Sequence, residues 1–69
     1  MIPIRLNGIS RQIPVPSTIL DILTLLQLPN MEYGVAVCLN DEIIPKPQWG
    51  LQQIQEGDVL EVVHATQGG

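Results

Sequence analysis

The stretch that decides the fold is residues 54–69, IQEGDVLEVVHATQGG, in which a turn, an apolar strand and a Gly-Gly end follow one another. Glu56-Gly57-Asp58 has the chemistry of a turn, because glycine accepts positive φ and the flanking acidic side chains can bond nearby backbone amides. Residues 59–64 then alternate imperfectly between apolar and polar, which predicts a strand buried on one face and partly covered on the other. Residues 65–69 carry no large apolar side chain, and we expect them to form a loose tail.

The closing Gly68-Gly69 pair has two explanations that the tail sequence alone does not separate. Chain ends often carry small residues, and such a pair can also be a remnant of cloning. Alternatively, an enzyme must reach the terminal carboxylate, and glycine makes the last peptide units thin and pliable enough to enter a narrow channel. Residues 66–69 can extend roughly 13 Å at about 3.3 Å each, enough to enter a partner's pocket while the folded body stays outside.

Length and composition predict one small domain with an aliphatic core. The chain has 69 residues, of which 45% are hydrophobic, with no Phe, one Trp and one Tyr. A chain of this length is near the lower limit at which a single core holds together, so no second domain is expected. We expect residues 1–65 to form the domain and residues 66–69 to form the flexible tail.

The chain is acidic, with a formal net charge of -4 and three basic residues. Nucleic acids and anionic membranes both require clustered Lys or Arg, so neither is expected as a partner, and a protein with an electropositive face fits better. The single Cys38 excludes an internal disulfide and agrees with a reducing compartment. The start of the chain lacks a secretory signal, and no apolar stretch approaches the roughly 20 residues that span a bilayer. These observations predict a cytoplasmic protein.

The first part of the chain reads as a β-hairpin. Residues 2–6 alternate between apolar and polar, and Asn7-Gly8 is the strongest two-residue hairpin signal. A second strand is predicted over residues 9–15, with Arg11 reaching into water from an otherwise apolar face. Pro3 and Pro14 lack the amide hydrogen, so each is expected at an edge or a strand end.

A helix is predicted over residues 19–28. Thr18 and Asp21 resemble a capping box at its start, and Pro29-Asn30 ends it. At 100° per residue a tight apolar stripe is expected from Ile19, Ile22, Leu23 and Leu26. The apolar surface is widened by Leu20, Leu25 and Leu28. Either a small domain wraps its helix deeply, or these leucines form an exposed patch that docks a partner.

The second half of the chain predicts two strands and an irregular segment. Residues 35–39 are an unbroken apolar run typical of a central strand, in which Cys38 is expected to be a small core residue rather than a nucleophile. A brief strand over residues 43–44 ends at Pro45. Trp49 is expected to cap the core with its indole edge toward solvent, and residues 51–54 to make a turn of helix.

Catalytic and metal-binding motifs are not evident in the sequence. The only lysine, Lys46, could contact a partner or be solvated, and the sequence favours neither. His64 has no second histidine or cysteine at ligand spacing, so a metal site is not expected. There is no phosphate loop, nucleophile–base pair or repeat, and we expect the domain not to be an enzyme.

The predicted order is hairpin, helix, strand, short strand and final strand, an α+β arrangement written ββαββ, with a mixed sheet packed on one helix. With parallel first and last strands it resembles the β-grasp or ubiquitin-like fold. The chain resembles the ThiS family of thiamine-biosynthesis sulfur carrier proteins over almost its whole length. The matching motifs are the Asn7-Gly8 hairpin, residues 18–23 of the helix, residues 35–40, Ile44-Pro45-Lys46 with Trp49, Glu56-Gly57-Asp58 and Gly68-Gly69. The sequence departs from the family at Ala65-Thr66-Gln67, where many relatives are more hydrophobic.

This resemblance implies a sulfur carrier whose C-terminal Gly69 bears the reacting group, while Gly68 provides clearance. An adenylyltransferase of the ThiF type, related to ubiquitin-activating enzymes, would transfer AMP from ATP to Gly69. A persulfide donor would convert the adenylate to a thiocarboxylate, and thiazole synthase of the ThiG type would receive the sulfur. ATP and Mg²⁺ would belong to these partners, so the chain itself is expected to bind no cofactor. Possible partner contacts are Leu20, Leu25, Leu28, Gln67 and the final strand.

Three other functions remain open at this point. The molybdopterin-synthase sulfur carrier subunit shares the fold and the ending, although it is often richer in Phe. A ubiquitin-like protein modifier would join Gly69 to lysines of other proteins. In a passive binding domain the two glycines would be incidental.

Overall fold

The computed structural model describes residues 1–26 and 34–64, and it begins with the predicted hairpin, β1 (Ile2–Leu6) and β2 (Ile9–Ile13). Between the strands Asn7 and Gly8 have φ values of 50° and 82°, as a two-residue type I′ turn requires. The strands pair antiparallel in the register that this turn sets, from Leu6 opposite Ile9 to Ile2 opposite Ile13. The hairpin prediction is therefore confirmed.

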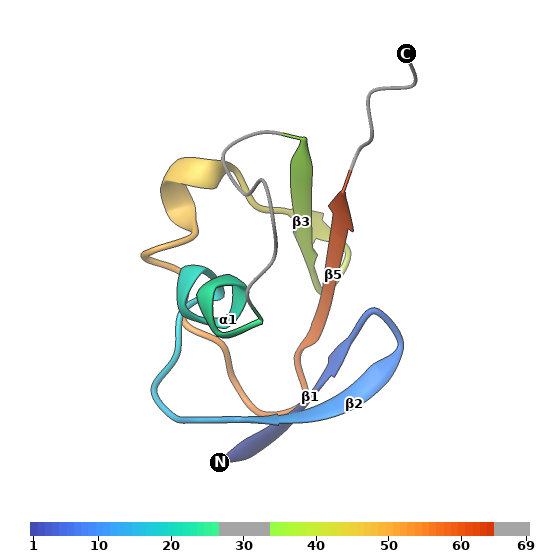
Figure 1. The fold of residues 1–69 in the computed structure, drawn as a ribbon, viewed down its shortest axis with the longest axis vertical. Coiled ribbons are helices and arrows are strands. Elements are labelled where there is room, and N and C mark those ends of the chain that lie inside the picture. The colour runs from blue at the N-terminus through green and yellow to red at the C-terminus, as the bar shows by residue number, and fades with distance from the viewer. Residues whose placement is uncertain (27–33, 65–69) are drawn as a thin grey trace.

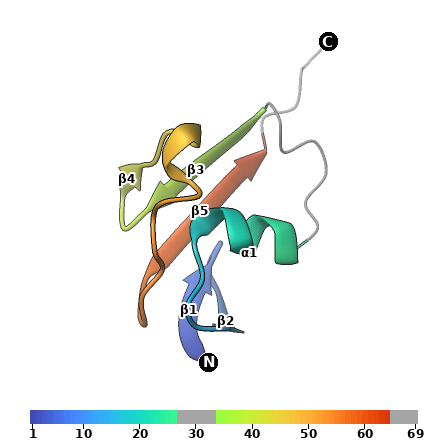
Figure 2. The same cartoon turned by 90° about the vertical axis from the view of Figure 1, so that its left-hand side faces the viewer.

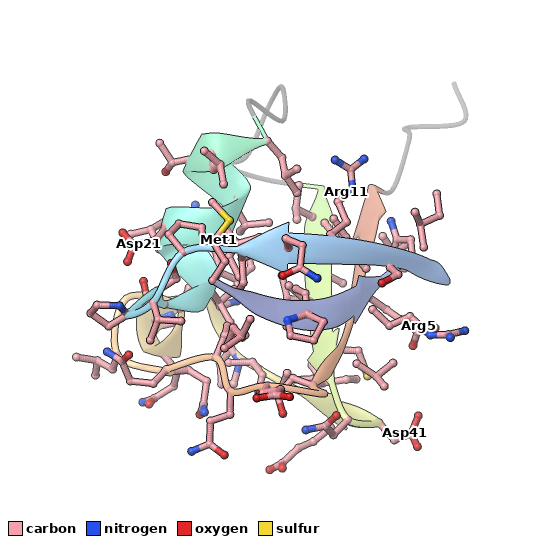
Figure 3. All side chains as sticks on the ribbon, turned by 90° about the horizontal axis from the view of Figure 1, so that it is seen from below. Met1, Arg5, Arg11, Asp21 and Asp41 are labelled. Atoms are coloured by element: carbon pink, nitrogen blue, oxygen red, sulfur yellow. The ribbon has the colours of Figure 1, made fainter. Side chains whose placement is uncertain are left out.

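The second strand is shorter than predicted, and most of its residues are exposed. It ends at Ile13 because Pro14 has no amide hydrogen for the ladder, and the Ser17 hydroxyl donates to the Pro14 carbonyl at 2.7 Å. On its apolar face Ile13 is buried, whereas Ile9 is 58% exposed. The Arg11 side chain is exposed, as expected, and extends away from the strand in Figure 3.

The helix α1 (Ile19–Leu25) begins with the predicted capping box. Thr18 Oγ1 accepts from the Asp21 amide at 3.2 Å, and the Asp21 carboxylate accepts from the Thr18 amide at 2.9 Å. The apolar stripe packs inward, with Ile19, Ile22 and Leu23 buried and Leu26 partly buried against them. The assigned helix ends three residues before the predicted end, and the last two predicted positions, 27 and 28, lie outside the described residues.

Among the described residues, five strands form one mixed sheet in the order β2-β1-β5-β3-β4, with α1 across one face (Figures 1 and 2). The remaining strands are β3 (Val35–Leu39), β4 (Glu42–Ile43) and β5 (Val59–His64). β5 runs parallel to β1 and antiparallel to β3, so the chain's final strand lies at the centre of the sheet. This arrangement confirms the predicted β-grasp, ubiquitin-like fold.

The core lies between the sheet and α1. Its buried hydrophobic residues are Ile4, Leu6, Ile13, Ile19, Ile22, Leu23, Val37, Leu39, Trp49, Ile54 and Leu60. Trp49 is only 3% exposed, and its Nε1–H donates to the Ile44 carbonyl at 2.9 Å, so the prediction of a solvent-facing indole edge is wrong. Because that carbonyl satisfies the indole N–H inside the protein, the whole ring can be buried.

Two further expectations need correction. The helical turn lies at η1 (Lys46–Gln48), where Pro47 suits the first turn, rather than over residues 51–54. Within residues 51–54, Gln53 forms an isolated β-bridge with Thr18 instead. Cys38 is only half-buried and is not part of the core, because it points to the face opposite Val37 and Leu39.

Candidate functional site

The candidate site is the end of β5, from which the chain continues to its terminal glycines. β5 ends at His64, which pairs with Val35, and in Figure 1 this end lies far from the N-terminus. The residues predicted to carry the function, Gly69, Gly68 and Gln67, lie outside the described residues. The structure therefore describes the strand that leads to these residues and not the residues themselves.

The turn before β5 is built as the sequence predicts. Gly57 has a φ of 85°, and its amide donates to the Pro3 carbonyl at 2.9 Å, which ties the turn to β1. The Asp58 carboxylate accepts from the Gln55 amide at 2.8 Å, confirming that a flanking acid bonds a nearby backbone amide. β5 thus starts from a fixed corner.

Backbone pairing then supports β5 unequally on its two sides. On the β3 side, the register continues from Leu60 opposite Leu39 to His64 opposite Val35. On the β1 side, only Val59 and Leu60 have strand partners. Pro3 has no N–H, and this pairing does not need one from it. The first N–H of β1 that bonds toward β5 is that of Arg5, which donates to the Asp58 carbonyl at 3.0 Å.

The face of the sheet opposite α1 carries an exposed apolar row. It contains Val59, Val63, Ala36 and Ile43, with half-buried Cys38 between β5 and β4. The exposed fraction is 39% for Val59, 59% for Val63 and 75% for Ile43. The second face of β5 is thus partly covered at Val59, as predicted, but open at Val63. We call this set of five residues the open-face row.

Two charged side chains adjoin the open-face row. Arg5 lies opposite Val59 in the β1–β5 register, and in Figure 3 its side chain extends away from α1. Glu61 lies opposite Cys38, within the row itself. Both side chains are exposed, so the apolar surface has one positive and one negative group at hand for orienting a partner.

The helix leucines occupy a different part of the surface. Leu20 is 43% exposed and Leu25 is 58% exposed, whereas Leu28 lies outside the described residues. Five positions apart, Leu20 and Leu25 lie about 140° from each other around the helix, so they do not form one patch. Leu20 lies beside the segment after η1: its backbone amide donates to the Trp49 carbonyl at 3.0 Å, and its Cδ2 would lie 3.7 Å from a Cβ placed on Gly50. The sheet separates both leucines from the open-face row.

Residues 1–26 and 34–64 contain no group of three His, Cys, Asp or Glu side chains that could hold a metal ion. In the same ranges, every buried side-chain nitrogen and oxygen has a hydrogen-bond partner. No helix among these residues is long and apolar enough to cross a membrane.

The sequence interpretation missed two features beside the site. The side chains of Asn7 and Asn40 hydrogen-bond to the backbone of β5, although the sequence indicated only a hairpin turn at Asn7 and no contact for Asn40. No local signal reveals such contacts, because they join residues far apart in the chain. The open-face row, by contrast, follows from the period-two parity of residues 35–39 and 59–64.

Comparisons with known proteins agree with this architecture. The model of the ThiS family matches residues 4–69. The sulfur carrier protein ThiS of Escherichia coli strain K12 is 33% identical over 45 residues, which are 65% of this chain and 68% of that protein. The crystal structure of the thiamine biosynthesis protein ThiS from Geobacter metallireducens matches with a TM-score of 0.85 at 23% identity, covering 99% of this chain and 100% of that one. Its solution structure matches with a TM-score of 0.82, also at 23% identity, covering 99% and 88%.

Proposed function

Because the chain belongs to the ThiS family, we propose that it is a sulfur carrier of thiamine biosynthesis, with the terminal carboxylate of Gly69 as its reacting group. The observation that carries this proposal is the extent of the family match, which runs to residue 69 and so includes the Gly-Gly end. The fold supports it, because β5 lies at the centre of the sheet and leads directly into residues 65–69. The folded domain then provides the surface that the modifying enzymes bind while they act on the terminal carboxylate.

The chemistry follows from the state of the terminal group. A free carboxylate is an anion at neutral pH and a poor electrophile, so it must first be activated. One of its oxygens attacks the α-phosphorus of ATP, which releases pyrophosphate and leaves an acyl adenylate on Gly69. A persulfide sulfur then attacks the carbonyl carbon and displaces AMP, giving an acyl disulfide. A thiol attacks the partner's sulfur of that disulfide and releases the thiocarboxylate, whose sulfur is now a nucleophile.

This scheme requires three partners in the cytoplasm. An adenylyltransferase of the ThiF type supplies the active site for adenylation and binds ATP and Mg²⁺. A persulfide donor supplies the sulfur. Thiazole synthase of the ThiG type accepts the sulfur, and attack of an oxygen nucleophile such as water on the Gly69 carbonyl carbon breaks its bond to sulfur and returns the carrier to its carboxylate form. The chain is therefore a co-substrate of these enzymes, and Gly68 gives the tail the clearance to enter their active sites.

We assign the open-face row to docking of the adenylyltransferase. Residues 65–69 span at most about 17 Å when fully extended, so an enzyme that holds Gly69 must contact the body near the end of β5. Val63 is the exposed apolar residue of the row next to that end, and it pairs with Ala36. Leu20 and Leu25 lie on the opposite layer, and we propose them for a separate contact with a later partner. Gln67 would enter the channel with the glycines.

Adenylation is tested by exchange of labelled pyrophosphate into ATP, catalysed by a ThiF-type adenylyltransferase. Exchange is expected to depend on this chain and to be lost when Gly69 is deleted. It is also expected to be lost when one residue is added after Gly69, because the carboxylate then lies one residue too far along the tail. Exchange that survives both changes would contradict a role for the Gly69 carboxylate.

The pathway is tested by deleting the coding sequence in its host. Growth of the deletion strain is expected to be restored by thiamine and not by a supply of molybdenum cofactor. The reverse result would assign the carrier to molybdopterin synthesis. Covalent adducts of higher mass in cell extract that require Gly68-Gly69 would instead indicate a protein modifier.

A further inference from the structure

The hydrogen bonds that hold β5 on the β1 side change character after Leu60. The Asn7 amide donates to the Leu60 carbonyl at 3.0 Å, as in a regular parallel ladder. In such a ladder the carbonyl of the same residue would accept the next bond, from the Val62 amide. Asn7 has instead left the strand conformation, with a φ of 50°, because the hairpin turns there.

The Asn7 side chain takes the place of this missing backbone partner. Its Oδ1 accepts from the Val62 amide at 2.8 Å, and its Nδ2 donates to the Val62 carbonyl at 3.2 Å. The carboxamide thus supplies the acceptor and the donor that the carbonyl of residue 7 and the N–H of residue 9 would supply if β1 continued alongside β5. The Asn7 side chain thereby extends the hydrogen bonding on the β1 side of β5 from Leu60 to Val62, two residues before the strand's last residue, His64.

Asn40 performs the same substitution on the other side of β5, at the opposite end of the strand. It follows β3 with a φ of 51°, and its amide donates to the Val59 carbonyl at 2.8 Å. Val59 returns its own N–H to Asn40 Oδ1 at 2.8 Å rather than to a backbone carbonyl. Asn40 Nδ2 donates to the Asp58 carboxylate at 3.1 Å. One asparagine therefore fixes the first residue of β5 and the other fixes the part next to the tail.

We propose that Asn7 is a positioning residue for the modification of Gly69. This inference rests on the proposed function, in which the body docks and the tail must reach the partner's active site. By hydrogen-bonding to Val62, Asn7 fixes the direction of the last residues of β5, from which the tail continues. The fraction of docked complexes in which the carboxylate meets ATP depends on that direction, and misplacement of a reacting group by about 1 Å can cost about a hundred-fold in rate.

The matched pair Asn7→Gly and Asn40→Gly tests this inference. Glycine accepts positive φ, so both variants keep their turns. Each loses two side-chain hydrogen bonds to β5 or its preceding residue, but only Asn7→Gly frees the end next to the tail. Hydrogen exchange of the Val62 amide is expected to rise about ten-fold in Asn7→Gly and to change little in Asn40→Gly.

The functional readout is adenylation by a ThiF-type enzyme, with the carrier as varied substrate. For Asn7→Gly we expect kcat to fall about five-fold or more while KM stays within about two-fold, because the docking surface is intact. For Asn40→Gly both constants are expected to stay within about two-fold of wild type. Asn7→Asp keeps the acceptor and loses the donor, and its kcat is expected to lie between those of wild type and Asn7→Gly.

Equal kcat values for the two glycine variants, with faster exchange at Val62 in Asn7→Gly, would overturn the positioning role and leave Asn7 a structural residue. Wild-type protein that no ThiF-type enzyme adenylates would overturn the proposed function itself, and this inference with it. The two failures are distinguishable, because the first requires an active wild-type carrier. A loss confined to KM would also contradict the inference, since it would place Asn7 in the docking surface.

Discussion

The substitution Val63→Gln tests the docking surface, and its effect can be worked out from the exposure of the side chain. Val63 is 59% exposed in the free protein, so much of it can still be buried by a partner. Full burial of a valine is worth about 1.5 kcal/mol, of which about 1 kcal/mol would be gained on docking. A neutral glutamine loses that gain and places an amide in the interface at a further cost of about 1 kcal/mol or more. The sum, about 2 kcal/mol, predicts a KM raised about thirty-fold.

The assay is the initial rate of pyrophosphate exchange at increasing carrier concentration. Val63→Gln is expected to raise KM with little change in kcat, because the tail is unaltered. The matched control is Leu20→Gln, an equally polar change at a residue that is 43% exposed on the helix side. Its KM is expected to stay within about two-fold of wild type. Urea unfolding of both variants is expected to show a free energy of unfolding within about 1 kcal/mol of wild type, because neither residue belongs to the core.

A wild-type KM for Val63→Gln would refute the assignment of the open-face row. A large increase for Leu20→Gln instead would place the docking surface on α1. If both variants raised KM, the enzyme would have to contact both the sheet and α1, although the reach of residues 65–69 requires a contact only near the end of β5.

Two further predictions concern the fold. Trp49→Phe is expected to lower the free energy of unfolding by about 2–3 kcal/mol, since it leaves the Ile44 carbonyl without its donor and opens a cavity in the core. Urea unfolding measures this loss, with Leu51→Ala, at a residue 72% exposed, as the control. A loss for Trp49→Phe as small as that for Leu51→Ala would contradict the prediction. Gly57→Ala is expected to cost about 1 kcal/mol, because the residue has a φ of 85° although an added Cβ would meet no atom within 4 Å. The control is Gly50→Ala, where the added Cβ would lie in ordinary contact, 3.7 Å from Leu20 Cδ2, and equal thermal stabilities of the two variants would refute the backbone argument.

Local chemistry made the hairpin and the start of the helix predictable from sequence. Asn7-Gly8 specifies its turn through two positive φ values, and Thr18 with Asp21 specifies a helix start through reciprocal hydrogen bonds. Each signal acts over a few residues, so no knowledge of the tertiary structure is needed. The parallel pairing of β1 with β5 is different, because it joins opposite ends of the chain, and it was inferred only through the resemblance to the β-grasp fold.

Distant residues decide the burial of Trp49 and the exposure of Ile9. Trp49 is buried because the Ile44 carbonyl accepts its N–H, and the sequence does not show that these two groups meet. Ile9 is exposed because it lies on the edge strand β2, at the hairpin end of the sheet. Cys38 could have been placed correctly, since the alternation along residues 35–39 puts it on the face opposite Val37 and Leu39.

For the candidate site, the sequence led to a prediction of the reacting group but not to the asparagine contacts that hold β5. Gly68 and Gly69 stay predictions from sequence, now accompanied by a family match that includes them. The asparagine contacts to β5 were not predictable, because Asn7 and Val62 are separated by 55 positions. A side chain that replaces a backbone partner leaves no periodic pattern in the sequence.

The most direct measurement is the intact mass of the protein after incubation with a ThiF-type adenylyltransferase, ATP, a persulfide donor and a thiol. We predict an increase equal to the replacement of one oxygen by one sulfur, located by fragmentation at Gly69 and absent from the protein that lacks this residue. An unchanged mass, under conditions in which a known carrier acquires sulfur, would contradict the proposal that this domain presents its end group for conversion to a thiocarboxylate.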